Sequence, residues 1–138
     1  MVMRNIVKLL VIVFTITLFN GCYDRGILDE KEFNHSLPNV ENLNYSKQGD
    51  VVSLTWDFPA TISDEFRRPL EVSIQVVENN IYRQKVIVRD ENESVDITID
   101  PTMEYRFIVK LLGFLTAEAR EEGLTDRVYS AGEVIEIE

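Results

Sequence analysis

The 138-residue chain holds 24 acidic residues against 14 lysines and arginines, which gives a formal net charge of −10 at pH 7. This balance argues against nucleic acid and anionic lipid headgroups as ligands, because phosphate recognition requires clustered basic side chains. The length suits one domain, and the single cysteine excludes an internal disulfide, so a hydrophobic core must stabilise the fold.

Residues 1–21 have the order of regions that is typical of a secretory signal. Arg4 and Lys8 supply a charged start, residues 9–19 are mostly apolar, and the small Gly21 precedes the cysteine. The apolar stretch has about 11 residues, whereas a helix that spans the hydrocarbon needs ~20. We therefore predict that residues 1–21 are a signal peptide and not a permanent transmembrane helix.

The residues Phe19-Asn20-Gly21-Cys22 resemble the lipobox of bacterial lipoproteins, which usually reads Leu, Ala or Ser, Gly or Ala, Cys. The chain departs from that form at Phe19 and Asn20. The resemblance implies that Cys22 is the lipidation site and the first mature residue, anchoring the protein in a membrane of the cell envelope, on its periplasmic or surface side. Two or more acyl chains, at ~0.8 kcal/mol per buried CH₂, give durable attachment. A plain signal peptide with an unmodified thiol stays open as the alternative.

Residues 22–37 are polar and lack a sustained period, so we interpret them as a tether between the anchor and a domain of residues 38–138. Fully extended at ~3.3 Å per residue, the tether would reach roughly 50 Å. Ile27, Leu28 and Phe33 are apolar, and their docking on the domain is the other possibility for this segment.

After Pro38 the apolar residues alternate with polar ones, and this period of two is typical of half-buried strands. Turn residues separate the runs, as in Gln48-Gly49-Asp50, Asp90-Glu91-Asn92 and Asp100-Pro101. Helical periods are nearly absent. The pattern predicts an all-β, seven-stranded immunoglobulin-like sandwich, with strands around residues 40–45, 51–56, 72–76, 85–89, 94–99, 105–111 and 134–138.

Two segments resemble the fibronectin type III family. Residues 52–59, Val-Ser-Leu-Thr-Trp-Asp-Phe-Pro, look like its second strand, V-x-L-x-W followed by proline. Residues 99–109 are similar to its segment L-x-P-x-x-x-Y-x-x-x-V. The resemblance covers residues 37–138 and implies a tyrosine corner at Tyr105, with the hydroxyl bonded back to the preceding connection. Trp56 lies on the side of its strand that carries the apolar residues Val52 and Leu54, so it is expected in the core.

The connection between Leu112 and Ala131 is longer than this family usually has, which leaves the path of the last strand open. Thr116 is placed to cap a turn of helix over residues 117–122, with Gly123 as its stop. Long connections are often functional. By the resemblance, this loop shares one pole of the sandwich with residues 57–69 and 90–93. Those loops would form a binding face of aromatic and arginine anchors: Phe66, Arg67, Arg68, Phe114, Arg120, Arg127 and Tyr129.

A second interpretation of that pole is structural, in which Phe114, Leu115 and Leu124 seal the open end of the core. Catalytic chemistry finds little support. The single histidine, His35, lies in the tether, so the domain can build neither a histidine-dependent triad nor a histidine metal site. The acidic run 90–93 lacks the glycine and spacing of a calcium loop and is interpreted as a solvated turn. We predict no catalytic residues, no metal and no cofactor.

The sequence therefore predicts a lipid-anchored envelope protein whose β-sandwich is a non-catalytic binding or adaptor module for an envelope protein or a polysaccharide. A polysaccharide requires exposed aromatic faces, for which Tyr45, Tyr82 and Tyr129 are the candidates. The alternative is a structural subunit that joins an assembly by strand exchange at a sheet edge. The acidic last strand, with Glu133, Glu136 and Glu138, disfavours such pairing. A carboxylate-based enzyme is the third hypothesis.

Overall fold

The computed structural model describes residues 35–120 and 123–137. The predicted signal peptide, Cys22 and most of the predicted tether therefore lie outside the described residues. Within the described residues no helix is formed, and therefore none that could cross a membrane. The described chain forms the strands β1 (Glu41–Gln48), β2 (Val51–Asp57), β3 (Glu71–Glu78), β4 (Ile81–Val88), β5 (Ser94–Thr98), β6 (Tyr105–Phe114), β7 (Arg127–Tyr129) and β8 (Glu133–Ile137).

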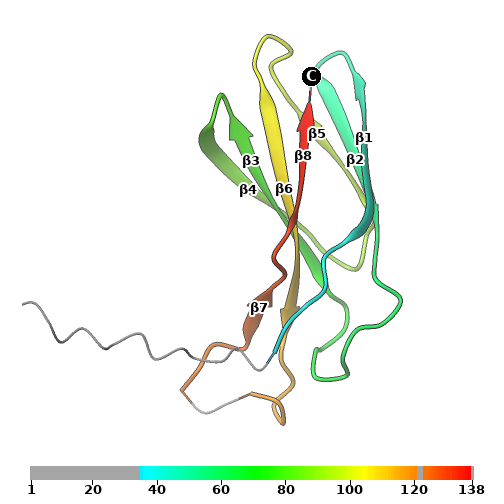
Figure 1. The fold of residues 1–138 in the computed structure, drawn as a ribbon, viewed down its shortest axis with the longest axis vertical. Coiled ribbons are helices and arrows are strands. Elements are labelled where there is room, and N and C mark those ends of the chain that lie inside the picture. Colours follow the sequence, from blue (N-terminus) through cyan, green and yellow to red (C-terminus); the bar gives the residue numbers. More distant parts are fainter. Residues whose placement is uncertain (1–34, 121–122, 138) are drawn as a thin grey trace, which may run out of the picture. The chain divides into compact units, whose positions relative to one another are not determined.

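The strands make two antiparallel sheets that face each other (Figure 1). One sheet has the order β1-β2-β5, and the other has the order β4-β3-β6, with both β7 and β8 paired to β6. Each predicted run of alternation is a strand in one of these sheets. The predicted all-β, fibronectin type III-like sandwich is confirmed.

The predicted count of seven strands is wrong by one, because the chain beyond the long connection pairs with β6 in two pieces. Leu112 faces Tyr129 on β7, whereas Tyr105 faces Ile137 on β8. Between the pieces, Gly132 adopts a φ of +99°, and a Cβ there would lie 2.8 Å from the Cγ atom of Lys110. The glycine therefore lets the chain turn away from β6 and return beside it.

The core lies between the sheets and is built by the inward side of each alternation. Trp56 is 2% exposed, which confirms its predicted place in the core. Leu37, which the sequence analysis assigns to the tether, belongs to the same cluster. The central strands β2, β3 and β6 supply most of the rest: Val52, Leu54, Val72, Ile74, Val76, Phe107, Val109 and Leu111.

The long connection makes a turn over residues 117–119, inside the range 117–122 for which a turn of helix is predicted. Thr116 does cap that turn: its Oγ1 accepts the amide of Ala119 at 3.3 Å, and its carbonyl accepts the amide of Arg120 at 3.1 Å. Residues 121–122 lie outside the described chain. The amide of Leu115 donates to the carbonyl of Asp126 at 2.7 Å, so the two ends of the connection are held together near β6 and β7.

Candidate binding site

Three connections meet at the pole where the binding face is predicted, and we call their described residues the loop cluster: 58–70, 89–93, 115–120 and 123–126. The amide of Arg67 donates to the carbonyl of Phe114, and the amide of Thr116 donates to the carbonyl of Glu65, both at 2.8 Å. These bonds lie on either side of a bridge between Phe66 and Leu115. Backbone pairing therefore holds the first and last connections as an extension of the sheet.

Phe66 is not an exposed anchor, so its predicted place on the face is wrong. It is 4% exposed and belongs to the core. The cause is Gly113 in β6, where a Cβ would lie 2.7 Å from Cδ1 of Phe66 and 3.0 Å from Cδ1 of Leu37. Glycine inside a strand often marks a close approach of another segment. That signal could have identified the contact.

Arg67, Phe114 and Arg127 are brought together as predicted, but they are engaged with one another. Each guanidinium carbon lies 5.6 Å from the centroid of the Phe114 ring. Arg67 also donates to the carboxylate of Asp126 at 2.8 Å. A cation over an aromatic face is favourable by about 0.5–1 kcal/mol at an exposed site. These three side chains therefore stabilise the loop cluster itself.

Arg68 pairs with Glu91 at 2.5 Å, and the same carboxylate accepts the backbone amide of Leu70 at 3.0 Å. The Leu70 amide, followed by the Arg68 guanidinium, holds the pKa of Glu91 below its ordinary value. The acidic run is therefore more than the solvated turn that we predicted, since Glu91 clamps one connection to another. Its neighbours Asp90, Asn92 and Glu93 are exposed.

The remaining predicted residues stand apart from these contacts. Arg120 is exposed in the long connection. Tyr129 is 38% exposed and lies on β7, opposite Leu112 of β6. In the described part of the chain, neither side chain takes part in a hydrogen bond, ion pair or ring contact with the cluster. The structure thus joins the arginines and Phe114 and leaves Arg120 and Tyr129 separate.

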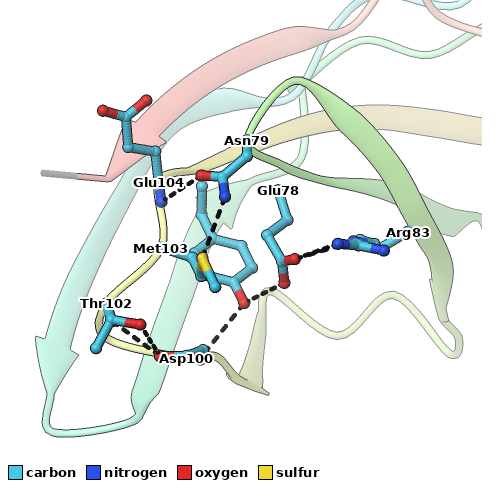
Figure 2. A network of polar contacts seen from close by, with 8 residues as sticks. Glu78, Asn79, Arg83, Asp100, Thr102, Met103 and Glu104 are labelled. Carbon is cyan, nitrogen blue, oxygen red and sulfur yellow. Dashed lines mark hydrogen bonds and ion pairs between the residues drawn. The ribbon is translucent and has the colours of Figure 1, made fainter.

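The opposite pole carries a polar network around Tyr105 (Figure 2). The backbone amide of Asp100 donates to the Tyr105 oxygen at 3.1 Å, which confirms the predicted tyrosine corner. The hydroxyl in turn donates to the carboxylate of Glu78 at 2.7 Å, and Arg83 donates to the same carboxylate. The Tyr105 and Arg83 hydrogen bonds lower the pKa of Glu78, while burial raises the pKa of Tyr105. Both groups keep their ordinary protonation at neutral pH, so neither is tuned for acid–base catalysis.

A pocket of about 540 Å³ adjoins this network. Its lining includes Tyr105, Met103, Arg106 and Glu136. The Nε atom of Arg106 is buried and has no hydrogen-bond partner among the described residues. Sequence reasoning missed Arg106, because the alternation in a strand does not distinguish an outward arginine with a buried Nε from one that is fully solvated. No group of three or more metal-ligating side chains occurs in the part of the chain that the structure describes.

Comparison with known proteins adds a family and a structural neighbour. Residues 22–137 match the model of a family described as Domain of unknown function (DUF4945). No curated protein matches the chain. Among solved structures, it is similar to the FN5 domain of Drosophila Lar at 14% sequence identity, with a TM-score of 0.41, over 71% of this chain and 92% of that one.

Proposed function

We propose, from the premise that this chain belongs to the DUF4945 family, that it is a lipid-anchored protein of the cell envelope whose domain binds a protein partner without catalysis. A β-sandwich of this fibronectin type III-like kind is a binding or structural module. The observation that carries the proposal of a non-catalytic role is that the carboxylates of Glu78 and Glu91 serve the fold itself. The Glu78–Tyr105 and Glu91–Arg68 contacts hold ionised carboxylates in fixed structural bonds.

Two features support the anchor. The order of charged, apolar and small residues before Cys22 is that of an export signal. The family match begins at residue 22, which the lipobox resemblance makes the first mature residue. We infer from both that the domain works outside the cytoplasm, held at a membrane by the acylated Cys22.

A protein partner is favoured over a polysaccharide by the placement of the exposed tyrosines. Tyr82 lies on β4 and Tyr129 on β7, at opposite edges of the larger sheet. Tyr45 is half-buried and lies on the other sheet. Such separated rings do not form one stacking platform for successive sugars. Strand exchange is disfavoured at the β4 edge, where Arg83 and Lys85 place charges and the pairing with β3 is interrupted by a register shift.

Intact-mass analysis of the full chain, extracted from the membranes of cells that make it, tests the anchor. We expect cleavage before Cys22 and the added mass of two or three acyl chains. In Cys22→Ser the acyl mass and membrane retention should both be lost. The matched control, Cys22→Ser with Ser46→Cys, restores a thiol at an exposed position of β1 and should remain unacylated. An unmodified Cys22 in the natural protein would refute the proposal.

A further inference from the structure

The two sheets present very different faces to solvent. On the sheet β1-β2-β5, the outward positions around Ser53 and Thr55 are polar: Asn44, Ser46, Ser94 and Asp96 are their register partners. Outward positions of a solvated antiparallel sheet are ordinarily polar. This face therefore needs no partner, and it provides an internal reference for the other one.

The outward face of β4, β3, β6 and β8 departs from that rule. Gln75 of β3 lies opposite Lys85 of β4 and Ile108 of β6. Ile108 in turn lies opposite Val134 of β8, so these residues form one row across four strands. Val134 is 55% exposed. The neighbouring rows contribute Tyr82, which is 57% exposed, and Ile87. We call Tyr82, Lys85, Ile87, Ile108, Lys110 and Val134 the outer face.

Some basic groups of this sheet lack partners among the described residues, although the chain as a whole is acidic. In the described residues, Arg67, Arg68, Arg83 and Arg89 each pair with a carboxylate. By contrast, the side chains of Lys85 and Lys110 make no hydrogen bond or ion pair within the described structure. In the row next to Ile108, Arg106 borders the pocket and leaves its buried Nε unpaired, with Glu136 opposite it in register.

From this combination we propose that the outer face docks an acidic segment of a partner protein. Apolar side chains of that segment would cover Ile108 and Val134, while its carboxylates would meet Lys85 and Lys110. A further carboxylate at the pocket would meet the guanidinium group of Arg106, which lines it. Charge complementarity of this kind sets the choice of partner and the rate of association. The inference rests on the proposed binding function and names the surface and partner chemistry for it.

Other occupants fit the face less well. A second copy related by a two-fold axis would bring the same patch against itself and set lysines near lysines. A polyanionic glycan would satisfy the lysines but would leave the Ile108 and Val134 side chains uncovered by apolar groups. An acidic protein segment matches both the charge and the apolar rows.

Photocrosslinking in cells that make the full chain tests the inference. The photoreactive residue p-benzoylphenylalanine replaces Val134 or Tyr82 on the outer face. Matched controls carry it at Thr55 on the polar sheet and at Ala117 in the loop cluster, both exposed. We expect protein adducts from positions 134 and 82, mapped by mass spectrometry to partner peptides that combine Asp or Glu with apolar residues. Thr55 should give none. An unchanged urea midpoint for each variant verifies its fold.

Charge reversal at Lys85 measures how much the basic residues of the outer face contribute to docking. Lys85→Glu should lower the adduct yield at position 134 at least about tenfold. The double substitution Ser46→Glu and Ser94→Glu makes the same change of two charges at exposed positions of the polar sheet, and it should leave that yield unchanged. Adducts with a second copy, a glycan or a lipid would overturn the inference, as would equal yields at Thr55. Adducts confined to Ala117 would overturn it while the proposed binding function stands. No adduct at any position would count against both.

Discussion

The hydroxyl of Tyr105 joins the start of β6 and the connection before it to the β3–β4 hairpin. It accepts the Asp100 amide and donates to Glu78, which also holds Arg83 (Figure 2). The residue is 7% exposed, so water cannot easily replace these bonds. Leaving buried polar groups without partners costs about 1–3 kcal/mol.

Tyr105→Phe should lower the free energy of unfolding by about 1–2 kcal/mol, because the Asp100 amide loses its acceptor and Glu78 loses a donor. Urea denaturation followed by circular dichroism measures the change. Tyr82→Phe removes a hydroxyl that has no partner within the described residues, so its effect should stay within about 0.5 kcal/mol. Equal effects of the two substitutions would contradict the structural role of the Tyr105 hydroxyl.

The carboxylate of Glu91 makes the fold sensitive to acid. Its pKa in the folded chain lies below the ordinary value of 4.5, because it accepts the Leu70 amide and pairs with Arg68. The unfolded chain therefore takes up the proton first as the pH falls. The stability that this carboxylate contributes is present above pH 4.5 and is lost as the pH falls through the folded pKa.

Glu91→Gln should flatten the acid side of the stability profile, since the amide cannot titrate. Urea midpoints between neutral and acidic pH measure this, and the substituted chain should be less stable at neutral pH but lose less on acidification. Glu93→Gln serves as the control, because that exposed side chain makes no hydrogen bond in the described structure. Profiles of Glu91→Gln and the natural chain that run parallel would refute the prediction.

At the scale of single elements, β6 organises the larger sheet. It pairs with β3, β7 and β8, and its Gly113 leaves room for Phe66 and Leu37. The close approach of Phe66 brings the connection 58–70 onto the end of β6. Without it, the loop cluster would lose one of the side chains that attach it to the core, beside Leu70 and Leu115.

Gly113→Ala should cost about 1–3 kcal/mol, because the added methyl overlaps the Phe66 ring in a filled core. The contact is tested by a double-mutant cycle with Phe66→Leu, in which the pair should cost less than the sum of the single changes by at least about 0.5 kcal/mol. A second cycle with Ile97→Val, in a strand of the other sheet, should be additive. Additivity in the Phe66 cycle would show that the two residues do not meet.

At the scale of the whole molecule, the segment before β1 belongs to the sandwich. Leu37 and Val40 are 6% and 4% exposed and lie in the core. Asn39 accepts the amide of Gly132 at 2.7 Å and donates to Glu133 at 2.9 Å. The segment therefore ties the first strand to the last. His35 lies 3.1 Å from Glu65, so the described chain begins beside the loop cluster.

A fragment of residues 41–138 should be about 3–5 kcal/mol less stable than a fragment of residues 35–138. Burial of a Val or Leu side chain stabilises by about 1.5–3 kcal/mol, and the shorter fragment lacks both Leu37 and Val40. Circular dichroism with urea compares the two fragments directly. Similar midpoints for both would place the start of the core after residue 40.

Patterns within short windows of sequence were sufficient for the strands, the sandwich class, the buried Trp56 and the Tyr105 corner. Alternation decides which side of a strand is apolar, and this property is local. The same parity marks Ile87, Ile108 and Val134 as outward apolar residues, which is a signal that sequence analysis could have used. It cannot tell whether another segment covers them.

Only the tertiary structure decided where Phe66 lies, how β7 and β8 share β6, and which basic groups lack partners. Each of these depends on contacts between residues far apart in the chain, such as Gly113 with Phe66 and Glu91 with Leu70. The free energy of such a contact comes from shape and charge that meet only after folding, and no periodicity in the sequence encodes it.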